Sequence, residues 1–257
     1  AAKQLKIEAP VPLPPLDAEA TLAPAGTVQT VRFSGPENLR GTIEARGSEL
    51  ALEVSAGSFA LPFFAGVTLN DFGMKGAATR QGMTVSEFDG RALDGVFSGN
   101  GRIRWGGEWS VDGELRVRGV NVGVFAPALV SEGKVEGRGN YAMKGAAPAK
   151  LGESLRLDGT FKIEKGALGS FDLGRAMQAT GPLSGRTVFT EMTGQGLYDR
   201  GAVQLRNVSI TAGALNAGAG VDIARDGALS GRVIVELKSA RSTLALSGKL
   251  QEPALRR

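Results

Sequence analysis

The chain has 257 residues, of which 42% are hydrophobic and 38 are glycine, so it is long enough to bury a sizeable core and too apolar to be disordered. It contains no histidine and no cysteine, which removes the commonest metal ligands, the thiol nucleophile and the side chain that titrates near neutrality. The net charge of +4 comes from scattered basic residues, and only 6% of the residues are aromatic, so no nucleic-acid partner is expected.

Proline dominates the first predicted segment, residues 1–26, which holds five prolines between Pro10 and Pro24. Proline lacks an amide donor, so this segment is predicted to be an extended lead-in or an edge strand. Residues 27–257 show short alternating runs separated by glycine-containing turns, which predict a single elongated β-sheet domain. No run reaches the roughly 20 apolar residues that span a bilayer. The chain starts without a signal peptide, and we interpret it as a mature form or a piece of a longer protein.

Alternation of apolar and polar residues is clearest in the second half of the chain. Period two with polar residues between predicts antiparallel strands with one dry and one wet face. Five Asp-Gly pairs, which favour tight hairpin turns, are read as turns. They begin at Asp89, Asp94, Asp112, Asp158 and Asp226. The expected dry-face residues are Phe161, Ile163, Val203, Leu205, Val221, Ile223, Val233, Val235, Leu237, Leu244 and Leu246.

Helix signals are few. Residues 122–133 and 170–180 are predicted to form short helices, the second with Ser170 or Asp172 as its N-cap. Strands of five or six residues, about 17–20 Å long, are expected to recur without helical crossovers. The predicted fold class is all-β: a long antiparallel glycine-rich meander, curled into a groove or an open, flattened barrel, with one or two short helices.

Catalytic chemistry has no recognisable pattern in this chain. The paired carboxylates, such as Asp89 with Asp94 and Glu132 with Glu136, each stand beside a glycine that is read as a turn residue. Residues 99–107, GNGRIRWGG, lack the Lys-Ser/Thr that a phosphate loop needs. We therefore predict no enzyme activity, no catalytic residue, no metal site and no cofactor. Trp105 and Trp109 are expected to pack across a hairpin tip, although a contact with a ligand or a surface remains an alternative.

A family resemblance is carried by an ordered series of phrases between about residues 110 and 253. Residues 155–177 read LRLDGTFKIEKGALGSFDLGRAM, and residues 114–145 read ELRVRGVNVGVFAPALVSEGKVEGRGNYAMKG. Residues 187–237 then run from TVFTEM to RVIVEL, and residues 244–253 close with LALSGKLQEP. Each phrase alone is glycine and apolar residues, but their order resembles the periplasmic C-terminal region of AsmA-like proteins.

The resemblance implies a protein of the Gram-negative envelope. AsmA-like proteins are anchored to the inner membrane by an N-terminal helix, which this chain lacks. They project an elongated sheet with an apolar floor into the periplasm, where they serve outer-membrane biogenesis and phospholipid movement. The expected function is therefore non-catalytic binding or movement of phospholipid along an apolar groove. The expected partners are lipid acyl chains, the inner membrane through the anchor, and envelope proteins.

Two alternatives stay open at this stage. The apolar face could be a closed core that packs against itself. The protein could also be a structural or accessory scaffold of an envelope or secretion machine, acting through strand addition at its sheet edges.

Overall fold

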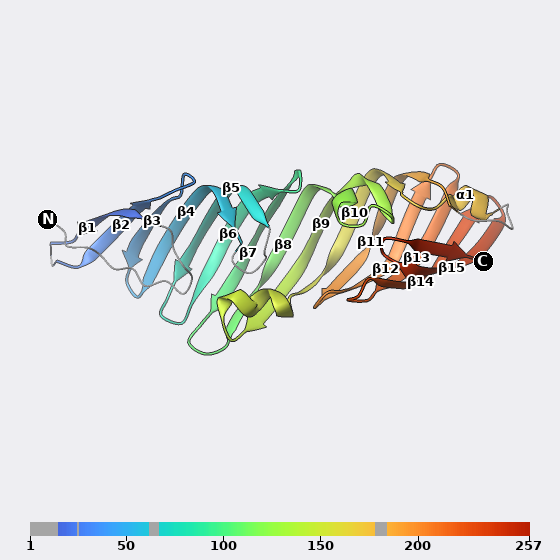
Figure 1. Cartoon of the computed structure of the whole chain (residues 1–257). Coiled ribbons are helices and arrows are strands. Elements are labelled where there is room, and N and C mark those ends of the chain that lie inside the picture. Colours follow the sequence, from blue (N-terminus) through green and yellow to red (C-terminus); the bar gives the residue numbers. More distant parts are fainter. Residues whose placement is uncertain (1–14, 25, 62–66, 178–183) are drawn as a thin grey trace. The chain divides into compact units, whose positions relative to one another are not determined.

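A computed structural model describes residues 15–24, 26–61, 67–177 and 184–257. Within these ranges, sixteen strands form one hydrogen-bonded order in which each strand lies beside the next in sequence (Figure 1). The two ends of this order are β1 (Asp17–Leu22) and β16 (Pro253–Arg256). They do not pair with each other, so the sheet is open. The all-β antiparallel meander expected from the sequence is confirmed.

Most strands are longer than the five or six residues expected, and β9 has 16. The hydrogen-bonded ladder continues through internal glycines instead of stopping at them. The other strands are β2 Val28–Ser34, β3 Arg40–Arg46, β4 Glu49–Ala60, β5 Thr68–Ala78, β6 Gly82–Ala92, β7 Gly95–Arg104, β8 Trp109–Asn121, β9 Val130–Gly145, β10 Arg156–Leu168, β11 Thr187–Asp199, β12 Ala202–Ala212, β13 Leu215–Ile223, β14 Ala228–Leu237 and β15 Ala240–Lys249.

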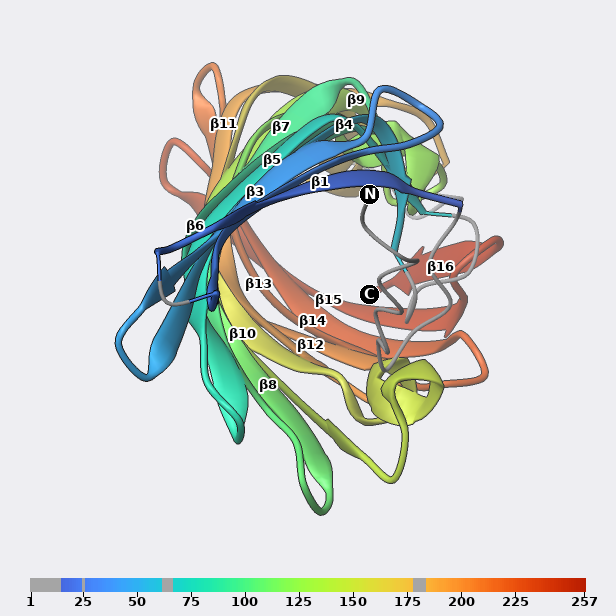
Figure 2. The same cartoon turned by 90° about the vertical axis from the view of Figure 1, so that its left-hand side faces the viewer.

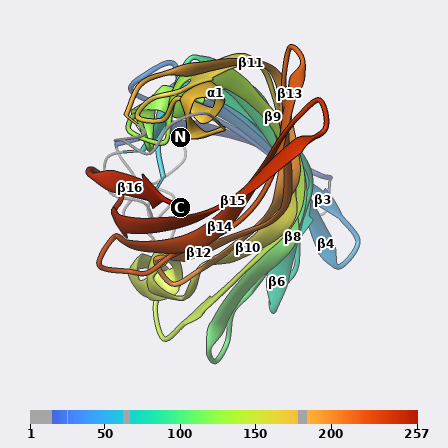
Figure 3. The same cartoon turned by 90° about the vertical axis from the view of Figure 1, so that its right-hand side faces the viewer.

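Two compact units divide the chain, and the division runs across the long strands β8 and β9. Unit 1 contains the described residues up to 92 together with 96–115 and 141–155, and Figure 2 views its strands from the β1 side. Unit 2 contains residues 93–95, 116–140 and the described part of 156–257, and Figure 3 views its strands from the β16 side.

Short helical turns occur at the two predicted places and at one more. In the region 122–133 only a 3-10 turn forms, η1 (Val122–Val124), because β9 takes over at Val130. The second prediction is met by α1 (Leu173–Ala176), whose N-cap is Asp172, with Oδ1 accepting from the Arg175 amide at 3.0 Å. Residues 178–180 of that prediction lie outside the described residues. A further 3-10 turn, η2 (Pro148–Ser154), has no counterpart in the predictions.

Three of the five Asp-Gly pairs are not turns, and the sequence interpretation was wrong there. Asp94 and Asp226 do lie in hairpin turns, but the pairs at Asp89, Asp112 and Asp158 lie inside β6, β8 and β10. Glycine is needed there for close packing. A Cβ on Gly159 would collide with the carbonyl of Arg138 on β9, and one on Gly90 would press on the side chain of Leu69.

Aromatic rings cover glycines on neighbouring strands. Phe33 on β2 lies opposite Gly41 on β3, and its ring occupies the space that a Cβ at Gly41 would take. The same arrangement joins Phe161 to Gly194 across β10 and β11. A ring over a glycine fills the gap that the missing side chain leaves on the face of the sheet. Gly41 and Gly194 therefore leave room for an aromatic side chain from the neighbouring strand.

Trp105 and Trp109 flank the turn between β7 and β8, as expected, with ring centroids 5.7 Å apart. The indole Nε1 of Trp105 donates to the carbonyl of Arg80 at 2.9 Å. Beside this hairpin, Val111, Met143 and Leu151 form the small core of unit 1, with Tyr141 packed against it. The Tyr141 hydroxyl donates to the Asn100 carbonyl at 3.1 Å.

Tyr141 gives a prediction about stability at high pH. Burial raises the pKa of the Tyr141 phenol from 10.0 to about 12, and the Asp112 carboxylate adds to the increase. The folded protein holds this proton more tightly than the unfolded chain does. The contribution of Tyr141 to the free energy of unfolding is therefore fully present below pH 10 and is lost as the pH rises to about 12. Denaturant midpoints measured across this window should fall more steeply for the wild type than for Tyr141→Phe. Equal slopes would contradict the assignment.

Candidate apolar binding face

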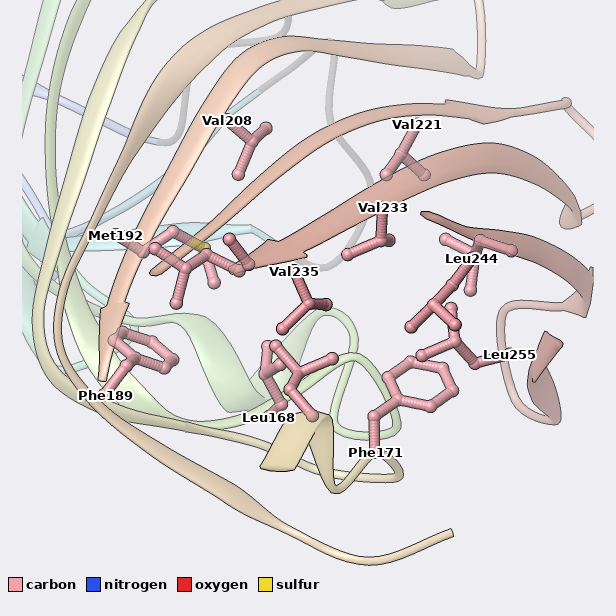
Figure 4. Packing of buried hydrophobic residues seen from close by; sticks show 14 of the residues in the cluster. Leu168, Phe171, Phe189, Met192, Val208, Val221, Val233, Val235, Leu244 and Leu255 are labelled. Atoms are coloured by element: carbon pink, nitrogen blue, oxygen red, sulfur yellow. The ribbon is translucent and has the colours of Figure 1, made fainter. Parts of the chain in front are cut away.

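The eleven residues expected on the dry face lie together on one face of β10 to β15, here called the apolar face. Their cross-strand register explains this. Leu205 lies opposite Val221, and Val233 lies opposite Leu244. Ten of the eleven belong to the main hydrophobic cluster of unit 2 or pack against it, and the eleventh, Val203, lies on the same face because it pairs with Ile223. Figure 4 shows Val221, Val233, Val235 and Leu244 of this set pointing into a common space.

A β-bulge in β12 keeps this face apolar along the whole strand. The register with β13 shifts between Leu205 and Val208, and Asn207 within the shift has a φ of 50°. Because the bulge adds one residue, Val203 and Leu205 before it and Ile210 after it point to the same face. Strict alternation without the bulge would turn the second half of the strand away from the cluster.

Burial divides the apolar face into two parts. Val235 and Leu244 are 0% exposed, and Ile163, Val221, Val233 and Leu246 are also buried. The remaining members keep part of their surface accessible and are here called the half-buried set. They are Phe161, Val203, Leu205, Ile223 and Leu237.

A short segment of the chain itself covers the fully buried part. Leu168 ends β10, Phe171 follows it and Leu173 begins α1, and all three are buried in the same cluster as Val235 and Leu244. Figure 4 shows Leu168 and Phe171 gathered with Val235, Leu244 and Leu255. At Val235 and Leu244, therefore, the apolar face is core and not an open surface.

Thr187 fixes this cover in place. Its buried hydroxyl donates to the Phe171 carbonyl at 2.8 Å and accepts from the Leu173 amide at 2.9 Å. Two further contacts lie at the surface. Arg257 donates to the carbonyl of Met177, the C-cap residue of α1, at 3.3 Å. Arg186, next to Thr187, forms an ion pair with Glu132 on β9 at 2.6 Å. The sequence analysis missed the cover. The clue was Phe171 and Leu173, apolar residues two apart that were read only as the start of a helix.

The opposite face of unit 2 is charged, and several of its charged side chains form ion pairs. Lys162 lies 2.8 Å from both Glu164 and Glu191, and Arg206 lies 2.6 Å from Asp222. The hydrogen bonds from Glu164 and Glu191 raise the pKa of Lys162 well above its usual value, so its ammonium group stays charged throughout the physiological range. The sheet in this unit therefore has one dry face and one ionic face.

Unit 1 has a cleft of a different kind, with a volume of about 850 Å³. It lies over the strands from β1 to β6, and most of its lining side chains are charged or polar, including Arg32, Glu53 and Lys75. Lys75 is already paired with Glu87 at 3.0 Å. Among the described residues, no group of three or more carboxylates is placed to hold a metal ion.

Helices in the described part of the chain are all too short to cross a membrane. Comparison with protein-family models, with curated proteins and with solved structures finds no match to the chain. The fold and the composition of its faces are therefore the basis for any functional proposal.

Proposed function

We propose that this protein is a non-catalytic protein of the cell envelope that binds phospholipid, or helps to move it, through the half-buried set of the apolar face. In this proposal it acts in the periplasm of a Gram-negative bacterium, held at the inner membrane in its full-length form, as the resemblance to AsmA-like proteins implies. The lipid's acyl chains would be its principal partner.

The observation that carries the proposal is the two-faced, open sheet of unit 2. Phe161, Val203 and Leu205 retain accessible surface on a face that is otherwise apolar, while the reverse face is lined with ion pairs. An acyl chain needs no specific polar contact, because each buried methylene contributes about 0.8 kcal/mol. Such a surface recognises hydrocarbon, and the charged reverse face keeps the sheet in water.

The position of the cover decides where lipid would bind. Val235 and Leu244 are already sealed by Leu168 and Phe171, so they are poor candidates for lipid contact. Val203 and Ile223 lie opposite each other at the other ends of β12 and β13, and neither is fully buried. We therefore assign the lipid contact to the half-buried set and the buried part to stability.

Substitution of Val203 tests the proposal. Val203→Asp places a charge on the half-buried surface and should abolish lipid that co-purifies from detergent-free extracts, measured by lipid mass spectrometry. It should also abolish binding of a fluorescent fatty acid. The matched control is Gln204→Asp, which puts the same charge on the exposed opposite face of the same strand and should leave both signals unchanged.

A milder variant distinguishes a loss of lipid binding from a loss of the fold. Val203→Thr keeps the shape of the side chain and adds a hydroxyl, which should weaken fatty-acid binding measurably while the far-ultraviolet circular dichroism stays as in the wild type. The proposal fails if the wild type carries no lipid and binds no fatty acid. It also fails if folded Val203→Asp protein binds as well as the wild type.

A scaffold role is the second candidate, and one observation favours it. Every residue of the edge strand β1 is exposed, and β1 has a hydrogen-bonded neighbour only on one side among the described residues. An unpaired edge offers backbone donors and acceptors to another chain. A wild-type protein that carries no lipid and yet retains specific protein partners would favour this reading.

A further inference from the structure

The two edges of the sheet differ in charge. β1 carries Asp17 and Glu19, whereas β16 carries Arg256 and is followed by Arg257. The side chains of Asp17, Glu19 and Arg256 are all exposed. Pairing of two β1 edges would bring carboxylates together, and pairing of two β16 edges would bring guanidinium groups together. Only β1 against β16 places opposite charges side by side, which is the pattern that selects one partner edge over another.

Strand direction also suits this pairing. β1 pairs antiparallel with β2, and β16 pairs antiparallel with β15. A β1 strand that adds antiparallel to a β16 strand of another molecule therefore continues the alternation at both edges. A parallel junction would be slightly less stable per residue.

The two faces match across the same junction. On β1, Ala20 lies opposite the buried Val31 and so belongs to the apolar side, while Glu19 lies opposite Arg32 on the polar side. On β16, Leu255 lies opposite Leu246 within the main cluster, and Arg256 lies opposite Ala245 on the other side. If Ala20 is placed opposite Leu255, then Glu19 falls opposite Arg256.

We propose that the chain associates head to tail with a second copy of itself, β16 of one molecule adding to β1 of the next with Glu19 beside Arg256. The exposed Leu22, at 57%, then lies next to Pro253 at the other end of the junction. β16 has only four residues, so the interface is small and the association is weak and concentration-dependent. A heterologous contact of this kind leaves a free β1 edge and a free β16 edge in a dimer, so it allows rings or open chains of more than two molecules. This inference is independent of lipid binding.

Charge reversal provides the first test, read by sedimentation equilibrium of the full chain over a wide concentration range. Glu19→Arg and Arg256→Glu should each lower the association constant roughly tenfold, because each sets like charges opposite one another. The double variant restores an opposite pair and should recover most of the wild-type association. A wild type that stays monomeric at every concentration, or a double variant as weak as the single variants, overturns the proposal.

Cysteine pairing provides the second test, since the natural chain has no cysteine. An equimolar mixture of Glu19→Cys and Arg256→Cys proteins should form a disulfide-linked heterodimer under mild oxidation. Each variant alone should link poorly, and Gln204→Cys mixed with Arg256→Cys serves as the control. Preferential linking within a single variant would show like-edge pairing and would overturn the head-to-tail arrangement. Equal linking in the control would show that the disulfides form by random collision, and it would also overturn the head-to-tail arrangement.

Discussion

Replacing Leu244 with alanine is expected to lower the free energy of unfolding of unit 2 by about 2–5 kcal/mol. Leu244 is 0% exposed and lies opposite Val233, within the cluster that Leu168 and Phe171 complete. The removed atoms lose their burial, and the packed strands around them cannot close the cavity completely. Denaturant unfolding followed by circular dichroism measures the difference, with the slope m expected to stay unchanged.

The matched control for this substitution is Thr243→Ala, one residue earlier on the exposed face of β15. It should change the free energy of unfolding by no more than about 0.5 kcal/mol. Similar effects for the two variants would mean that the side of β15 carrying Leu244 is not a packed core, and the division of the apolar face into a buried and a half-buried part would then be lost.

Replacing Phe189 with alanine should have an effect at least as large, about 3–5 kcal/mol. The ring is 1% exposed and lies over Gly166, which is its cross-strand partner on β10. A Cβ at Gly166 would collide with the tip of the ring and lie 2.6 Å from the Glu132 carbonyl oxygen. The Phe189 ring and Gly166 therefore pack as one unit. We expect the effects of their substitutions on the free energy of unfolding to be non-additive.

A double-mutant cycle measures this coupling. Gly166→Ala alone should cost about 1–3 kcal/mol through overpacking, but less in the Phe189→Ala background, where the ring is gone and only the Glu132 carbonyl remains close. Strictly additive effects would contradict a ring-over-glycine unit. Gly218→Ala is a suitable control, since the nearest atom to a Cβ there is 3.8 Å away, an ordinary contact.

Alternation along the chain was sufficient to predict the fold class and to assign eleven residues to the apolar face, but it did not predict Val208 and Ile210, which follow the bulge in β12. Val233, Val235 and Leu237 repeat at period two, and that period alone assigns them to one side of a strand. Asp-Gly pairs were less reliable. The same dipeptide is a turn at Asp226 but lies within β10 at Asp158, because the neighbouring backbone there approaches too closely for any side chain.

The covered and uncovered parts of the apolar face could not be distinguished from sequence. Leu244 and Leu205 belong to equally regular alternating runs, yet one is sealed and the other is half-buried. The difference comes from Phe171 and Leu173, which lie far away in sequence and whose backbone is hydrogen-bonded to Thr187 at this face. A contact between distant segments does not alter the alternation of apolar and polar residues in either segment, so it cannot be predicted from that alternation.

The nearest-neighbour order of the strands has a consequence for how the protein is made. Because each strand that the structure describes pairs only with the strands before and after it in sequence, none of these pairings has to wait for a distant part of the chain to be synthesised. Contacts between residues close in sequence also cost little loop-closure entropy and favour fast folding. The sheet can therefore grow hairpin by hairpin behind the ribosome or a translocon, with its newest strand always serving as the template for the next.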